Sequence, residues 1–240
     1  MKLILAGGGG PKDSELLDKK LIDSMPDKSK MLYIPIAMWQ DHTYSECYDF
    51  IRHTFQKFNF TDIEMWTDLN NKTYEDIKDF GCVYIGGGNT FKLLYELRKT
   101  NFIEPLIKYI KNNGIVYGGS AGAIIFGSTI EFAQDNNFIK LTDFKGLNLL
   151  NEHMIWCHYN KSDDKKLFDL SKKNKIPILA IPEKSGIFID NENVSVIGTE
   201  NVYLFQNNNT KTDYKHGENI RTQNLYKTVY YSNGGKKVDA

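Results

Sequence analysis

The chain has 240 residues, enough to bury one sizeable core, and its 41 % of apolar residues is typical of a folded globular domain. Thirty basic side chains balance thirty acidic ones, so no basic surface favours nucleic acid as a partner. No segment reaches the roughly 20 apolar residues of a membrane-spanning helix, and we expect no signal peptide. Because Cys47, Cys82 and Cys157 lack zinc-site spacing, we expect a reduced, cytoplasmic protein without a metal.

Short apolar runs alternate with amphipathic segments in the first half of the chain. The periodicity predicts strands at 2–6, 30–37, 61–66, 81–89 and 115–117, and helices at 14–24, 43–58, 89–100 and 102–114. Apolar strands separated by helices predict a parallel sheet that is covered on both faces. A further short strand is expected at 154–157.

The pattern changes after about residue 176, where β-rich runs follow one another with tight polar turns between them. We expect these runs, within 177–190, 193–206 and 225–233, to add partly antiparallel strands to the same sheet. The Asn- and Lys-rich segment 206–219 is expected to be a solvated loop. No linker divides the chain, so one domain over residues 1–240 is predicted.

The segment "GGSAG" (118–122) matches the G-x-S-x-G pattern and directly follows a predicted strand. A serine on a sharp strand-to-helix turn presents its hydroxyl above the sheet, and its small neighbours let a substrate carbonyl approach. Ser120 is therefore a candidate nucleophile. The alternative is a tight turn in which Ser120 only caps the following helix.

A serine nucleophile needs a base and an acid that orients the base. In a parallel sheet, functional groups gather at the carboxyl ends of the strands. His158 and Glu183 each follow an apolar run and satisfy this rule, whereas His153 precedes its strand and would lie at the opposite edge. Asp135, in the loop after the serine motif, is the rival for the role of the acid.

The glycine turn in "YIGGGNTF" follows another predicted strand and leads into a helix. The backbone N–H groups of Gly88 and Ala121 are the expected oxyanion donors. Asn89 or Thr90 is expected to cap the helix, and both residues are expected to contact substrate. Neither this turn nor "AGGGGPKDS" completes a dinucleotide-binding or P-loop motif.

Together, "YIGGGNTFKLL", "GGSAGA", "WCHYN" and "IPEKSG" closely resemble the peptidase E family of serine hydrolases, which includes aspartyl dipeptidases and, more distantly, cyanophycinases. The resemblance implies a flavodoxin-like α/β fold of the class I glutamine amidotransferase type. This fold is a three-layer sandwich with a mostly parallel sheet, helices on both faces and extra C-terminal strands. The resemblance also implies a triad of Ser120, His158 and Glu183 and an oxyanion hole at Gly88 and Ala121.

One departure concerns the substrate. Aspartyl dipeptidases of this family use an arginine soon after the catalytic histidine. Residues 159–170 contain no arginine, and their basic side chains are Lys161, Lys165 and Lys166. A lysine could replace the charge but not the bidentate geometry. Preference for N-terminal aspartate is therefore not expected to carry over with the chemistry.

We expect a serine peptidase that cleaves short peptides, as a dipeptidase does, through an acyl-enzyme. It would need no metal or organic cofactor, bind neither nucleic acid nor membrane, and act as a monomer or homodimer. Two alternatives remain open. The same scaffold could hydrolyse another amide, an isopeptide or an ester, or the chain could be a non-enzymatic ligand-binding protein.

Overall fold

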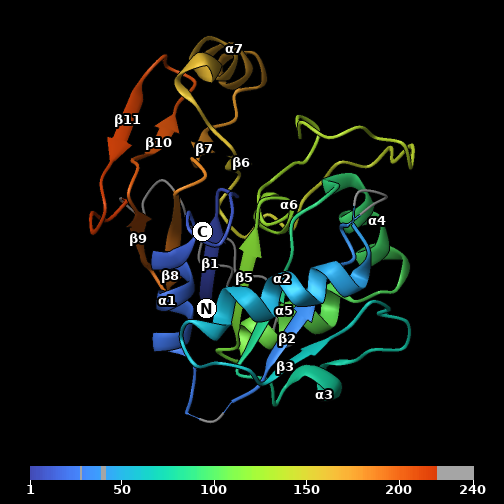
Figure 1. The fold of residues 1–240 in the computed structure, drawn as a ribbon. Helices are drawn as coiled ribbons and strands as arrows, with labels where there is room; N and C mark the ends of the chain where they lie inside the picture. Colours follow the sequence, from blue (N-terminus) through green and yellow to red (C-terminus); the bar gives the residue numbers. More distant parts are fainter. Residues whose placement is uncertain (28, 39–41, 221–240) are drawn as a thin grey trace, which may run out of the picture.

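A seven-stranded sheet forms the centre of the computed structural model, which describes residues 1–27, 29–38 and 42–220 (Figure 1). Its order is β3-β2-β4-β5-β1-β8-β9. The strands are β1 (Lys2–Ala6), β2 (Met31–Ile34), β3 (Ile63–Met65), β4 (Cys82–Ile85), β5 (Ile115–Gly119), β8 (Ser185–Asp190) and β9 (Asn193–Gly198). The first five are parallel, while β8 runs antiparallel to β1 and β9 to β8.

Helices cover both faces of this sheet, as its apolar strands require. Helices α1 (Glu15–Ser24) and α2 (Tyr44–Gln56) cover one face. The other face is covered by α4 (Thr90–Lys99), α5 (Ile103–Lys111) and the short α6 (Ala121–Ile124), with α3 (Tyr74–Ile77) packed against α5. The predicted α/β architecture with a mainly parallel, doubly covered sheet is confirmed.

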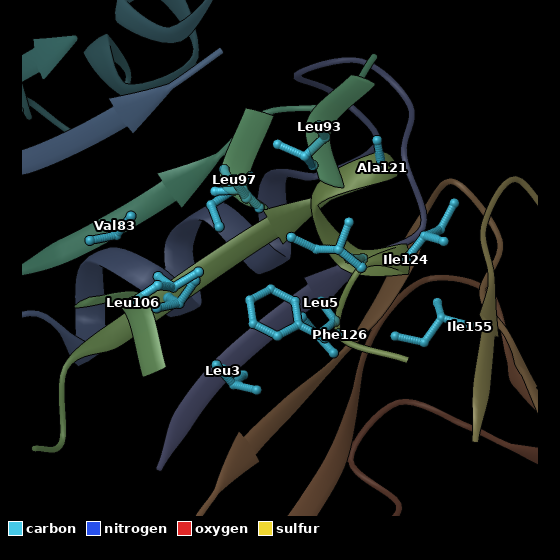
Figure 2. Close-up of a cluster of buried hydrophobic side chains, with 14 of the residues drawn as sticks. Leu3, Leu5, Val83, Leu93, Leu97, Leu106, Ala121, Ile124, Phe126 and Ile155 are labelled. Carbon is cyan, nitrogen blue, oxygen red and sulfur yellow. The ribbon is translucent and has the colours of Figure 1, made fainter. Parts of the chain in front are cut away.

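The larger core lies between the sheet and α4, α5 and α6. Alternate residues of the strands point to this side, among them Leu3, Leu5 and Val83, and meet Leu97 and Leu106 from the helices (Figure 2). All five side chains are fully buried. Strand alternation sends the intervening residues to the α1–α2 face, where they form a second core.

The C-terminal strands differ from the prediction, because they do not all extend the central sheet. A separate sheet of order β11-β10-β7-β6 stands beside it at the upper left of Figure 1, packed against α7 (Asp164–Asn174). Its strands are β6 (Met154–Trp156), β7 (Ile178–Ala180), β10 (Val202–Phe205) and β11 (Lys211–Tyr214).

Two smaller predictions also fall in this region. The segment 206–219 is not only a loop, because β11 lies within it and pairs with β10. The strand predicted at 225–233 lies outside the described residues. Among the helices of the described ranges, none combines the length and the apolar character needed to cross a membrane.

Candidate active site

Ser120 sits on a strained turn at the carboxyl end of β5. Its φ of 49° and ψ of −110° lie outside the regions that L-residues ordinarily adopt, a conformation that costs of order 1–3 kcal/mol. Close backbone contacts leave no room for side chains beside Ser120. A Cβ on Gly118 would lie 2.3 Å from the carbonyl oxygen of Gly122, and a Cβ on Gly122 would lie 2.3 Å from the carbonyl oxygen of Ile85. The turn therefore requires the glycines of the motif and lifts the hydroxyl off the sheet.

His158 bridges Ser120 and Glu183. Its Nε2 lies 2.7 Å from Ser120 Oγ, and its Nδ1 lies 2.9 Å from Glu183 Oε1. An ionised carboxylate only accepts hydrogen bonds, so the shared proton belongs to Nδ1 and Nε2 is free to accept the serine hydroxyl. His158 and Glu183 side chains are 43 % and 52 % exposed, so this chain of hydrogen bonds is open to solvent and to ligands.

The sequence led us to expect these three side chains at one edge of a single sheet. They come from two sheets instead. Ser120 follows β5 of the central sheet, whereas His158 and Glu183 follow β6 and β7 of the smaller one. Backbone hydrogen bonds join the two: Ser120 N–H donates to Ala6 O at 3.1 Å, and His158 N–H donates to Gly7 O at 2.9 Å. The end of β1 thus aligns the hydroxyl with the imidazole.

The glycine run after β1 has a role that sequence reasoning missed. Gly8 has a φ of +122°, and a Cβ there would lie 2.2 Å from Cε1 of His158. A Cβ on Gly7 would lie 2.1 Å from the carbonyl oxygen of Pro182, next to Glu183. The run is therefore the surface on which the imidazole rests. Its position at the carboxyl end of the first strand was the available signal.

Asp135 does not contact His158 but binds the start of α4. Its Oδ2 accepts hydrogen bonds from the N–H of Thr90 at 2.9 Å and from the hydroxyl of Thr90 at 2.5 Å. Asn89 caps the same helix through Lys92 N–H at 3.0 Å and donates from Nδ2 to Asn136 O at 2.9 Å. The loop after α6 thereby fixes the glycine turn.

This arrangement corrects the expectation that Thr90 contacts substrate. The Thr90 side chain is fully buried and its hydroxyl donates a hydrogen bond to Asp135, whereas Asn89 lines the cavity beside Ser120. Of the expected oxyanion donors, Ala121 directly follows Ser120 and Gly88 belongs to the glycine turn after β4. Among the described residues, no group accepts a hydrogen bond from the N–H of Gly88 or of Ala121. The glycine turn also lies against Ser120, since a Cβ on Gly87 would be 3.3 Å from Ser120 Cβ.

The other candidates of the sequence lie elsewhere. His153 is buried, its Nδ1 lies 2.9 Å from Leu150 O, and burial lowers its pKa. None of the lysines that follow His158 lines the cavity, and Lys166 lies over the Trp156 ring at 4.4 Å. Within the described residues, no three His, Cys, Asp or Glu side chains gather as they would around a metal ion.

A cavity of about 1410 Å³ opens in front of Ser120 and His158. It continues from the glycine turn to the α1–α2 face of the sheet, where side chains of β2, β4 and β5 and of α2 line it. Phe50 and Phe138, two of the exposed large apolar side chains, also line it. A peptide could therefore reach the serine hydroxyl and extend along the sheet.

Comparison with known proteins assigns the chain to a family of enzymes. A profile of peptidase family S51 matches residues 3–197, and the chain belongs to this family of serine peptidases. It is 29 % identical over 202 residues to a peptidase E of Nostoc sp., covering 80 % of this chain and 81 % of that one. A peptidase E of Shewanella sp. is 31 % identical over 138 residues, covering 54 % of this chain and 58 % of that one.

Solved structures share the fold. A putative peptidase E from Listeria monocytogenes superimposes with a TM-score of 0.67 at 22 % identity, covering 83 % of this chain and 98 % of that one. A peptidase from an acI-B1 actinobacterium gives a TM-score of 0.69 at 19 % identity, covering 92 % and 96 %. The flavodoxin-like fold that the resemblance implied is confirmed.

Proposed function

We propose that this serine peptidase cleaves short peptides, as a dipeptidase does, through a Ser120–His158–Glu183 triad and an acyl-enzyme. The observation that carries the proposal is the continuous hydrogen-bonded chain from Glu183 through His158 to a strained, solvent-accessible Ser120. A nucleophile, a base in reach of its proton and an acid that orients the base are the parts that acyl transfer needs.

In the first half of the reaction, Ser120 Oγ attacks the scissile carbonyl carbon while His158 Nε2 takes the hydroxyl proton. The N–H groups of Gly88 and Ala121 stabilise the oxyanion, and a donor of this kind contributes about 3–4 kcal/mol. The C–N bond then breaks as His158 returns the proton to the leaving amine. Glu183 holds the imidazole in the correct tautomer and stabilises the imidazolium.

In the second half, water attacks the acyl-enzyme. His158 takes a proton from this water. When the second tetrahedral intermediate collapses, the bond between the acyl carbon and Ser120 Oγ breaks, His158 returns the proton to Oγ, and the carboxylic acid product leaves. All of these steps use side chains and backbone of the chain itself, so the proposal requires no metal or organic cofactor.

Related expectations form part of this proposal. One domain over residues 1–240 would carry the activity, with Asn89 as a contact to the substrate. A cytoplasmic location is supported by Cys47, Cys82 and Cys157, which are all buried and form no disulfide.

The test is product analysis of a dipeptide library by mass spectrometry, with the wild type and Ser120→Ala prepared in parallel. We expect release of single amino acids by the wild type and none above background by the variant. Hydrolysis that persists in Ser120→Ala would refute the triad. Cleavage of esters or isopeptides but of no dipeptide would keep the triad and overturn the substrate.

A further inference from the structure

Three side chains of the smaller sheet and its helix, Lys211, Asp164 and Tyr159, form a hydrogen-bonded group that we call the lysine cluster. Lys211 starts β11, the edge strand of this sheet in Figure 1. Its ammonium donates to both carboxylate oxygens of Asp164 at 2.9 Å and to the hydroxyl of Tyr159 at 2.8 Å. The Tyr159 hydroxyl in turn donates to Asp164 Oδ1 at 2.6 Å. The three N–H groups of the ammonium thus have three acceptors.

Aromatic rings surround the Lys211 ammonium. It lies 4.4 Å from the centroid of the Tyr203 ring and 5.3 Å from the centroids of the Tyr159 and Phe205 rings. The side chains of Lys211 and Asp164 are 21 % and 28 % exposed, so water screens this ion pair less than a pair on the surface. Burial opposes ionisation of Asp164, but the hydrogen bonds from Tyr159 and Lys211 outweigh it and lower the pKa of the carboxyl. The carboxylate therefore stays charged near neutral pH and keeps both donors.

The lysine cluster adjoins the loop that carries the base of the triad. This loop, which we call the His158 loop (157–163), connects β6 to α7. Tyr159 directly follows His158, and Asp164 is the first residue of α7, so their hydrogen bond spans most of the loop. A second side-chain contact spans it as well, because Trp156 Nε1 donates to Asp163 Oδ2 at 3.3 Å. The position of His158 therefore depends on side chains at both ends of the loop.

His158 needs such support because its backbone is strained. Its φ is +52°, in the left-handed region that residues other than glycine rarely adopt, and such a conformation persists only where the surrounding structure holds it. The N–H of His158 donates to Gly7 O at 2.9 Å, which fixes the loop on the side of the central sheet. On the other side the next residue, Tyr159, is held by the lysine cluster. Both contacts keep Nε2 at 2.7 Å from Ser120 Oγ.

We propose that Lys211 is a positioning residue for the base of the triad: through Asp164 and Tyr159 it holds the His158 loop so that the imidazole meets the serine hydroxyl. The proposal rests on the proposed triad. No residue of the lysine cluster lines the cavity in front of Ser120, so the cluster acts on the base and not on the substrate. The family profile ends at residue 197, so this support comes from a strand beyond the part of the chain that the profile matches.

The test separates the position of the base from the binding of substrate. Values of kcat and KM are measured for the dipeptide that the wild type cleaves fastest. Lys211→Met keeps the apolar stem and removes the ammonium; we expect kcat to fall at least about tenfold, since a misplacement of about 1 Å can cost 100-fold, while KM stays within about twofold. Lys211→Arg offers parallel N–H groups to both oxygens of Asp164 and should keep kcat within about threefold of the wild type. Tyr159→Phe, which keeps the ring and its packing, should lower kcat at least about fivefold.

Two controls exclude a role in folding alone. Urea unfolding identifies the variants that are folded under the assay conditions, and rates are expressed per active site. The matched control is Lys78→Met, which removes the ammonium of an ion pair with Glu75 at 2.7 Å in the α3 region; its kcat and KM should equal those of the wild type. Wild-type kcat in folded Lys211→Met and Tyr159→Phe would overturn the proposal. A folded Lys211→Arg variant as slow as Lys211→Met would also overturn it.

The rate at which a fluorophosphonate modifies Ser120 separates this proposal from the choice of substrate, because the reaction needs the base but no peptide. We expect the second-order rate constant of Lys211→Met to be at least about tenfold below that of the wild type, even if the wild type cleaves no dipeptide. Equal rate constants in the wild type and folded Lys211→Met would refute the positioning role and leave the triad intact. A wild type as unreactive as Ser120→Ala would refute the triad, and the positioning of its base with it.

Discussion

Replacing Asp18 with asparagine is expected to stabilise the protein and to change how its stability depends on pH. The carboxyl is fully buried, and burial raises its pKa from 3.8 to about 7, although hydrogen bonding from Ser14 and the charge of Lys57 oppose the shift. The native state therefore holds this proton more tightly than the unfolded chain does. As a result, the free energy of unfolding falls as pH rises from about 4 to about 7.

The size of the effect follows from the shift. One pKa unit corresponds to about 1.36 kcal/mol, so ionising Asp18 in place costs the native state about 4 kcal/mol at pH 8. Between pH 5 and pH 8 the loss of unfolding free energy due to this group is about 3 kcal/mol. The asparagine variant lacks this loss.

Urea unfolding of the wild type, Asp18→Asn and the surface control Asp23→Asn from pH 5 to pH 8 measures this quantity. The difference between Asp18→Asn and the wild type should grow with pH by about 3 kcal/mol, while Asp23→Asn should follow the wild type. Other titrating groups such as buried His153 cancel in the difference. Parallel curves for Asp18→Asn and the wild type would refute the assignment of a buried, proton-binding carboxyl.

Two further predictions concern the active site. Glu183→Gln should lower kcat by about 10³–10⁴, as loss of a triad acid does. Asp135→Asn should lower kcat less than about tenfold, because asparagine can still accept the hydrogen bonds from Thr90. Steady-state rates that fall more for Asp135→Asn would reverse the assignment of the acid. Gly8→Ala should lower kcat about 100-fold in a folded protein because its Cβ displaces His158; wild-type turnover by this variant would show that the imidazole does not rest there.

Most of the strand–helix order of residues 1–119 could be predicted because the longer elements there have a clear period, and the end of β5 identified Ser120. Helix α3 was missed, since its four residues are too few to show a helical period. The second sheet could not be predicted. Its strands β6 and β7 have three residues each, and such short apolar runs do not say which sheet they join. Strand β11, "KTDY", is polar because much of it is exposed, so it had no hydrophobic signal.

The rule that functional groups gather at the carboxyl ends of strands selected His158 and Glu183. It did so although their strands belong to the smaller sheet, because both sheets end at the same site. Asp18 gave no signal at all, since one carboxylate on an amphipathic helix is ordinarily solvated. The packing of α1 against the sheet, with Tyr84 and Tyr117 nearby, buries it. Thr90 was misread for a similar reason, because its partner Asp135 lies in a loop without a pattern of its own.

Mass spectrometry of the protein after reaction with a fluorophosphonate tests the central claim most directly, because this reagent labels a serine only where a base activates it. We predict one adduct, on Ser120, in the wild type and none in Ser120→Ala or His158→Ala. A wild-type protein that stays unlabelled under conditions that label a known serine hydrolase, or an adduct on another residue, would contradict the account.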